Sequence, residues 1–356
     1  MTMRLLATLI LILLPAACAL AGEFHQTFDF DADALQIRNM IGKVEVVPAG
    51  GDRIKVSLQV RGKDADQDLI TFDTRTDGDG DVLAIQFPIQ DHREYVYPAM
   101  GSGSVASFHY GKKGSDSWWR RLFGGDRKIT VRGEGDGPEI WVDARVEVPA
   151  DHAVTVKLGA GTIEARDVDA DLVLDSHFGP ITARDMAGAL LCDTGSGAVR
   201  VIGMEGRLTV DTGSGSVGVS GCAGPALLVD TGSGSVEAAD IDCRQLVIDT
   251  GSGPVRARGV RADQAHIDTG SGSVQLQLDR MGGGDFRVDT GSGSITLELP
   301  ADASASILAE NGSGSLNLER QDAVVEHKSD HEMKLVVGSG EASVDLDAGS
   351  GSITVK

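Results

Sequence analysis

The sequence predicts an all-β protein, a parallel β-solenoid (β-helix) of about nine coils of 18–21 residues with a β-rich N-terminal cap region. Three observations predict this class. A short motif recurs at nearly constant spacing, apolar and polar residues alternate on both sides of each copy, and the 356-residue chain combines 47 glycines with only 4% aromatic residues. Few large rings and many glycines suit a thin fold with tight turns better than a thick globular core.

The repeated motif is Asp-Thr-Gly-Ser-Gly, and its six full copies begin 18, 19, 19, 19 and 21 residues apart. The copies begin at Asp193, Asp211, Asp230, Asp249, Asp268 and Asp289. Weaker copies begin at Lys157, Asp175 and Glu310, which makes nine units in tandem. Units of this length are typical of solenoids, in which a unit buries its apolar face only by stacking on its neighbours.

Each unit is expected to contain two short strands, a turn and a corner. Around the copy at Asp211, Leu208 and Val210 alternate with polar residues before the turn, and Val217 and Val219 alternate after it. The Gly-Ser-Gly segment is expected to use glycines with positive φ. The Asp is expected to accept hydrogen bonds from the N–H groups of its own turn, and the Thr shares the inward parity of the core residues. A further apolar position, eleven residues after the Asp, is expected at the corner.

The N-terminus predicts a signal peptide over residues 1–21. Arg4 precedes an apolar run, and residues 19–21 fit an A-x-A cleavage site. We therefore expect an exported protein of the bacterial periplasm or cell surface, with a lipoprotein anchored through Cys18 as the alternative. No transmembrane helix is expected in the mature chain, because the apolar run is too short to span a bilayer comfortably.

The mature chain is divided into three regions by pattern. Residues 22–150 are a β-rich cap region, in which residues 39–44 resemble a degenerate first coil and a hairpin is expected around residues 77–81. Residues 151–321 are the solenoid repeats. Residues 322–356 are expected to be capping strands that close the other end.

An insertion at residues 91–137 interrupts the cap region with Gly, Ser and charged residues. It contains Trp118, Trp119, Arg120 and Arg121, which are candidates for contact with a membrane surface, a glycan or a partner protein. The alternative is that the two tryptophans pack over the open end of the solenoid, because solenoids need end caps.

The repetition of the motif argues against aspartic protease chemistry, which a single copy would suggest. Val-Asp-Thr-Gly-Ser is typical of an aspartic protease, which uses two facing carboxylates that share a proton, whereas stacked coils place the six motif aspartates in one column. Carboxylates about 4.8 Å apart repel one another, so the column is a candidate calcium site. The alternative is that backbone N–H groups neutralise it. No other cofactor and no catalytic residue is predicted.

The remaining candidates are cysteines and histidines. Cys222 and Cys243 fall near one corner of consecutive coils, so a disulfide between them is one alternative. Cys192 is expected to be a buried thiol. His327 and His331 are spaced like helix-borne metal ligands, but their charged surroundings favour a solvated loop.

The segment from Val142 to Val201 resembles the candidate adhesin domain family of bacterial envelope proteins, a β-strand repeat family of unknown function. The resemblance rests on the lead-in Val148-Pro149 and on Gly-x-Val/Ile turns that recur every 18 to 21 residues; the stretch LQIRNMIGKVEVVP also resembles the start of that family. It covers most of residues 33–320 and leaves the insertion unmatched. It implies a β-solenoid at the cell envelope and no catalytic residues.

Taken together, these patterns predict an exported, non-enzymatic envelope protein that acts as an adhesin-like interaction module or structural scaffold. The expected partner is an envelope protein or glycan, because a net charge of −21 repels nucleic acid and anionic lipid. One alternative is a calcium-stabilised structural protein resembling a β-roll. Another is a glycan-acting β-helix enzyme, which would need paired carboxylates facing a groove.

Overall fold

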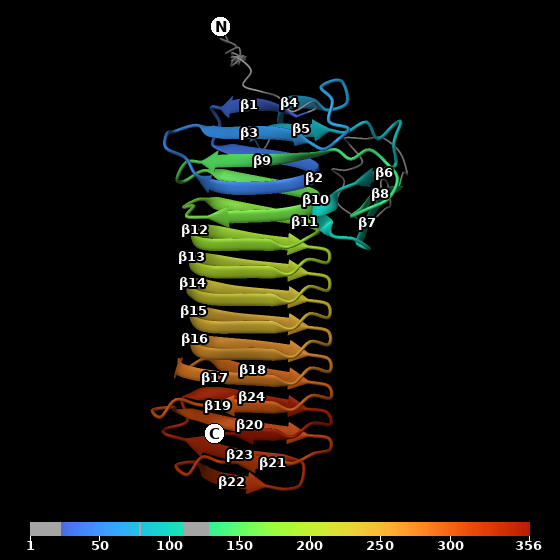
Figure 1. The fold of residues 1–356 in the computed structure, drawn as a ribbon. Coiled ribbons are helices and arrows are strands. Elements are labelled where there is room, and N and C mark those ends of the chain that lie inside the picture. The colour runs from blue at the N-terminus through green and yellow to red at the C-terminus, as the bar shows by residue number, and fades with distance from the viewer. Residues whose placement is uncertain (1–22, 78–79, 110–127) are drawn as a thin grey trace.

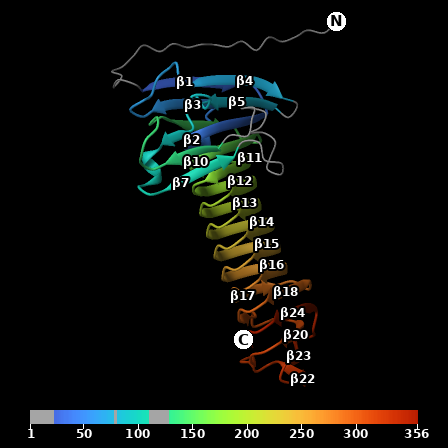
Figure 2. The same cartoon turned by 90° about the vertical axis from the view of Figure 1, so that its right-hand side faces the viewer.

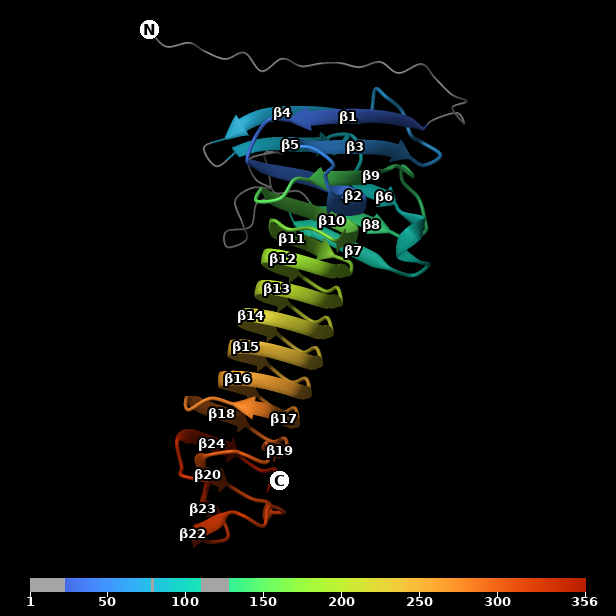
Figure 3. The same cartoon turned by 90° about the vertical axis from the view of Figure 1, so that its left-hand side faces the viewer.

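The computed structural model describes residues 23–77, 80–109 and 128–356. In this part of the chain the strands stack into one long, flattened β-solenoid, so the predicted fold class is confirmed (Figure 1). Figure 2 and Figure 3 show that the stack is thin and that its N-terminal end is broader. The described residues contain no helix that is both long and apolar enough to cross a membrane.

Five regular coils form the centre of the stack, and each contains one long strand that bends at a corner. We call the half before the corner the first face and the half after it the second face; a tight turn then leads to the next coil. These strands are β12 (Ile181–Thr194), β13 (Val199–Thr212), β14 (Val217–Thr231), β15 (Val236–Thr250) and β16 (Val255–Thr269).

Neighbouring coils pair in parallel, and equivalent residues are 18 or 19 positions apart. Val199 pairs with Val217, which pairs with Val236, which pairs with Val255. Because each coil is hydrogen-bonded to the coils on both sides, equal inward positions of successive coils form apolar columns. These columns are the core, which lies between the two faces.

Each corner turns through one residue with a left-handed backbone, a conformation in which Gly and Asp are common. Their φ values lie between 53° and 70°, and the residues are Asp185, Gly203, Gly221, Asp240 and Gly259. The apolar residue that follows is at most 6% exposed in every coil, which confirms the predicted corner position. These residues are Met186, Met204, Cys222, Ile241 and Val260.

The threonine of each motif points inward and is at most 1% exposed. In the coil of Thr231, its hydroxyl donates to the carbonyl oxygen of Gly215 one coil earlier (3.3 Å) and accepts from the N–H of Gly234 in its own turn (3.1 Å). The same two bonds recur at Thr194, Thr212, Thr250, Thr269 and Thr290. The prediction that the Asp serves its own turn is therefore wrong, since the inward parity brings the Thr hydroxyl to the turn.

The turn glycines are needed for close stacking and not for a left-handed backbone, which corrects the expectation of positive φ. None of the glycines in the six Gly-Ser-Gly turns has a positive φ. A Cβ on Gly234 would lie 1.8 Å from the carbonyl oxygen of Gly215, and the second glycines of the other five turns show distances of 1.7–1.9 Å. A side chain at this position would push the coils apart.

The predicted degenerate first coil exists. It is β2 (Ala34–Pro48), which pairs in parallel with β10 (Ala153–Arg166) and places Gly42 opposite Gly161. From β10 the stack continues through β11 (Asp171–Phe178) to β12. The chain therefore leaves the stack after its first coil, builds the cap, and returns.

The cap extends both faces beyond β2. On the first face, β9 (Trp141–Val148) pairs with β2, and β3 (Ile54–Arg61) and β1 (Phe24–Phe30) follow in antiparallel order. On the second face, β5 (Gly80–Gln86) pairs with β2 and forms the predicted hairpin with β4 (Thr71–Asp77).

Phenylalanines join the outermost strands of the cap. The ring centroid of Phe72 on β4 lies 6.4 Å from that of Phe24 and 5.7 Å from that of Phe28, both on β1. These aromatic contacts bring the two faces together at the N-terminal end.

The described parts of the insertion form a small separate sheet beside the cap, seen in Figure 3. It contains β6 (Glu94–Val96), β7 (Val105–His109) and β8 (Lys128–Arg132), with a short 3₁₀ helix at Pro98–Met100. Tyr97 packs on Trp141 of β9, with ring centroids 5.5 Å apart.

The C-terminal coils do not stack in sequence order. The strands after β16 are β17 (Val274–Met281), β18 (Asp285–Thr290), β19 (Ile295–Glu298), β20 (Ala305–Asn311), β21 (Leu316–Leu318), β22 (Val324–Lys328), β23 (Glu332–Val337), β24 (Ala342–Ala348) and β25 (Ile353–Val355). β24 pairs in parallel with both β18 and β20, and β25 with both β19 and β21. The last strands of the chain thus lie between two coils that precede them.

Two predictions for this end are therefore corrected. The unit at Glu310 does not stack on the unit at Asp289, because Asp347 lies between them in register. Residues 322–356 are not all capping strands: β22 and β23 extend the far end as an antiparallel hairpin on β20, whereas β24 and β25 are interior.

We predict that deleting residues 342–356 abolishes the amide protection of β21 in hydrogen-exchange mass spectrometry and lowers that of β20, which keeps its antiparallel partner β23. The deletion removes their parallel partners, and coils of a solenoid are held by their neighbours. Protection of β13–β15 in the same sample should stay unchanged and serves as the internal control. Retained protection of β21 would mean that it does not depend on β25 and would contradict the prediction.

We predict that Thr231→Val lowers the free energy of unfolding by roughly 1–3 kcal/mol, because it leaves the buried N–H of Gly234 and carbonyl of Gly215 without this hydroxyl. Urea unfolding followed by circular dichroism measures the change. Thr231→Ser, which keeps the hydroxyl, should lose less. Asp230→Asn, at the outward neighbour, is the control, and an equal loss in that variant would show that the Asp matters as much as the Thr.

Candidate functional site

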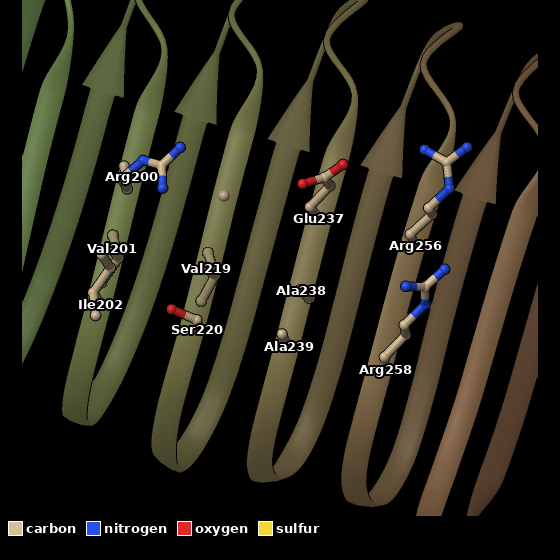
Figure 4. Close-up of a pocket in the computed structure, with 11 residues that line it drawn as sticks. Arg200, Val201, Ile202, Val219, Ser220, Glu237, Ala238, Ala239, Arg256 and Arg258 are labelled. Atoms are coloured by element: carbon tan, nitrogen blue, oxygen red, sulfur yellow. The ribbon is translucent and has the colours of Figure 1, made fainter.

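A shallow groove lies on the first face of β13–β16, where outward side chains of four successive coils meet (Figure 4). The register places Arg200, Gly218, Glu237 and Arg256 in one row across the coils. Strand alternation turns these side chains outward, since the residues that follow them, Val201, Val219, Ala238 and Ala257, are buried in the core.

A second outward row runs parallel to the first, two residues further along each strand. It contains Ile202, Ser220, Ala239 and Arg258. The two central coils therefore carry Gly218, Ser220 and Ala239 at three of four outward positions, and these small residues form the floor of a hollow of about 260 Å³. Figure 4 shows the arginines at its two sides.

The groove is positively charged on an acidic protein. Its ionisable lining residues are three arginines and Glu237, whereas the chain has a net charge of −21. Within the described residues, Arg200 and Arg256 have no ion-pair or hydrogen-bond partner. Arg258 donates to the side-chain oxygen of Gln275 (3.2 Å).

Exposed guanidinium groups can bind carboxylate, sulfate or phosphate through two parallel hydrogen bonds. Glu237 can accept hydrogen bonds from hydroxyl groups. The groove therefore offers anion recognition at both sides and hydroxyl recognition between them. Glycoside hydrolysis generally uses a pair of carboxylates, and Glu237 is the one carboxylate among the lining residues.

The groove was missed in the sequence because its residues come from four coils, up to 58 positions apart, within a repeat that draws attention to the motif itself. A signal was present. Aligning the repeats by their turns places Arg200 and Arg256 at the same outward position, with Gly218 in the same row and Ser220 and Ala239 beside it. Strand alternation turns these positions outward, so the small residues among larger ones would then have indicated a hollow on the surface.

The six motif aspartates form the predicted column, on the second face beside the turns. Asp193, Asp211, Asp230, Asp249, Asp268 and Asp289 occupy one register, with their side chains outward. Asp347 and Glu310 continue the column beyond Asp289. At the other end, Arg38 and Lys157 take the same register, and Lys157 lies 3.4 Å from Asp175.

The column has the electrostatics of closely spaced like charges. Partial burial raises the pKa of the Asp211 carboxyl above its ordinary value of 3.8, and the negative charge of Asp230 raises it further. Burial and then the charge of Asp289 likewise raise the pKa of Asp347. Within the described residues, no three His, Cys, Asp or Glu side chains are grouped so that they could hold a metal ion. Calcium at the column stays a prediction from the sequence.

A family model described as Toastrack DUF4097 matches residues 125–356, which include the coils from β10 onward and the groove. The chain belongs to the Toastrack family. The match begins just before β8 and so leaves out β2, which precedes the insertion in the sequence and stacks on β10.

Three solved structures align with this Toastrack chain over nearly its whole length. A candidate cell adhesion protein from Clostridium sporogenes is 13% identical, covers 94% of this chain and 99% of its own, and has a TM-score of 0.20. Candidate adhesins from Bacteroides fragilis (10% identity, 94% and 97% coverage, TM-score 0.32) and Parabacteroides merdae (12% identity, 95% and 97% coverage, TM-score 0.34) are similar. TM-scores this low carry no argument about function. No curated protein matches the chain.

The other residues predicted as candidates are not part of the groove. Trp118, Trp119, Arg120 and Arg121 lie outside the described residues, as does the signal peptide. His327 and His331 are exposed at the far end of the Toastrack stack, where His327 lies 4.0 Å from Glu332.

The disulfide considered between Cys222 and Cys243 is not formed, and both thiols are free and buried. Register explains this, because Cys222 lies opposite Ile241, while Cys243 lies opposite Gly224. Burial raises the pKa of Cys222 to about 12 and that of Cys243 to about 11, which keeps both thiols protonated at neutral pH. Cys192 is a buried core thiol, as predicted.

We predict that Asp211→Asn is more stable than the wild type at neutral pH and that this advantage disappears as the pH falls below 3.8. The folded state raises the pKa of Asp211, so it binds the proton more tightly than the unfolded state, and stability is lost as pH rises through the raised pKa. Urea midpoints across pH measure the difference.

Asp242→Asn provides the matched control with the opposite sign. The hydrogen bond from Arg261 lowers the pKa of Asp242, so its carboxylate stabilises the fold above the ordinary aspartate pKa and the variant should be less stable than wild type at neutral pH. If Asp211→Asn and Asp242→Asn shifted stability in the same direction, the repulsion within the column would not be the cause.

Proposed function

We propose that this protein is an exported, non-enzymatic interaction module of the bacterial envelope, adhesin-like in role, which binds an envelope molecule along the first face of its solenoid. The observation that carries the proposal is the groove between Arg200 and Arg256. It places unpartnered guanidinium groups around a floor of small residues on an otherwise acidic chain.

The architecture supports a binding role. Coil-to-coil pairing holds the first-face strands in fixed register from β13 to β16, so the outward side chains keep constant spacing without any ligand. A preorganised surface loses little conformational entropy when it binds. The resemblance of the repeats to the candidate adhesin domain family points to the same role.

The groove chemistry favours binding over catalysis. Its lining residues contain one carboxylate and neither Cys nor His, so they supply no carboxylate pair of the kind that glycoside hydrolysis uses. Glu237 is therefore assigned to hydrogen bonding. The glycan-acting enzyme and the calcium-stabilised structural protein stay predictions from the sequence.

We predict that the purified protein co-sediments with isolated bacterial envelopes and releases no reducing ends from them. Sedimentation followed by a reducing-sugar assay on the supernatant measures both. Glu237→Gln tests whether Glu237 is catalytic. If it only forms hydrogen bonds, neither the wild type nor this variant should release reducing ends. Lack of co-sedimentation would contradict the proposal, and so would release of reducing ends by the wild type that is lost in Glu237→Gln.

A further inference from the structure

The charge order along the groove is specific. In the row that crosses the coils, Arg200 is followed by Gly218, Glu237 and Arg256, so a positive, a neutral, a negative and a positive position follow one another. With about 4.8 Å between coils, the two arginines are about 14 Å apart along the stack. A ligand lying along the stack meets two anion sites separated by one site that repels anions.

We infer that the groove binds an acidic polysaccharide in which charged sugars alternate with uncharged ones, with the chain lying along the stack. Carboxylate or sulfate groups of separate sugars contact Arg200 and Arg256, whose long side chains can lean toward each other to meet charges closer together than their own coils, and an intervening uncharged sugar places its hydroxyls over Gly218 and Glu237. This inference rests on the proposed function, since it names the class of envelope molecule that the first face binds.

The floor of the groove has room for a sugar ring. A Cβ built on Gly218 would have no heavy atom within 4 Å, so the space above this glycine is open. The neighbouring floor residues, Ser220 and Ala239, are also small, and Ser220 adds a hydroxyl that can donate and accept. Arg258 borders the same floor and can reach an anionic group displaced toward the corner.

A glycan fits this surface better than a peptide does. The groove lies across the middle of the stack, where each first-face strand is already paired with a strand on both sides. An extended peptide that adds to a sheet needs a free strand edge, and the groove offers none. A polysaccharide is recognised through its charges and hydroxyls, which the groove side chains supply.

The test measures binding of immobilised oligosaccharides to the full-length mature protein by biolayer interferometry. Hyaluronan, which alternates uronate with a neutral sugar, is the matching probe, and alginate, which carries a carboxylate on every sugar, is the mismatched one. We expect hyaluronan to bind more tightly than alginate, and Arg200→Ala/Arg256→Ala to weaken hyaluronan binding at least about tenfold, because hydrogen bonds to charged groups are lost.

Two further variants distinguish the groove from general charge and from misfolding. Arg207→Ala/Arg244→Ala removes two exposed arginines outside the groove from coils of the same stack and should leave binding unchanged. Gly218→Leu fills the open floor without removing a charge and should abolish binding. Because a Cβ at Gly218 would have no heavy atom within 4 Å, the circular dichroism and thermal midpoint of this variant should match those of the wild type.

Glu237→Gln tests the alternating pattern itself. Removing the central negative charge should raise the affinity for alginate toward that for hyaluronan. The inference is overturned if alginate binds the wild type as tightly as hyaluronan does, or if the control double variant weakens binding as much as Arg200→Ala/Arg256→Ala. Envelope co-sedimentation without hyaluronan binding overturns this inference alone, whereas loss of both overturns the proposed function as well.

Discussion

Backbone hydrogen bonding between parallel coils is the constraint on which the rest of this structure depends. A coil of 18 or 19 residues returns each strand to the same register, so every inward position repeats directly above its equivalent. At the turns, where no strand ladder exists, the buried threonine hydroxyls connect one coil to the next. The second glycine of each turn then lets the backbones approach closely.

Because the inside of the stack is fixed in this way, variation is confined to the outward positions. The second face carries carboxylates in every regular coil, and partial burial together with the charge of Asp230 raises the pKa of Asp211. The first face carries a different outward residue at almost every coil. The groove arises there because Gly218 in one outward row, and Ser220 and Ala239 in the next, interrupt larger side chains, so a binding surface forms without any change to the core.

Much of the fold followed from the sequence because the coil is a local, repeated pattern. Strand alternation predicted the inward Thr, and the apolar corner position was recognised from its spacing alone. The role of the Asp was assigned wrongly because both side chains next to the turn can accept hydrogen bonds, and only the inward one reaches the turn. The order of the last coils was not predictable, because residues 305–318 and 342–355 both carry the coil pattern, which specifies a coil but not its neighbours. The groove depends on residues from four coils and required the exact register.

The placement of β24 and β25 between earlier coils has a consequence for how the chain is completed. Synthesis proceeds from the N-terminus, and folding of large proteins tends to follow that order. Residues 305–318 are made before their final neighbour exists, so both they and β18 present an unpaired edge until the last fifteen residues arrive. Such edges invite pairing with other chains. β24 and β25 therefore act as closing strands, because each of them pairs with an earlier strand on both of its edges.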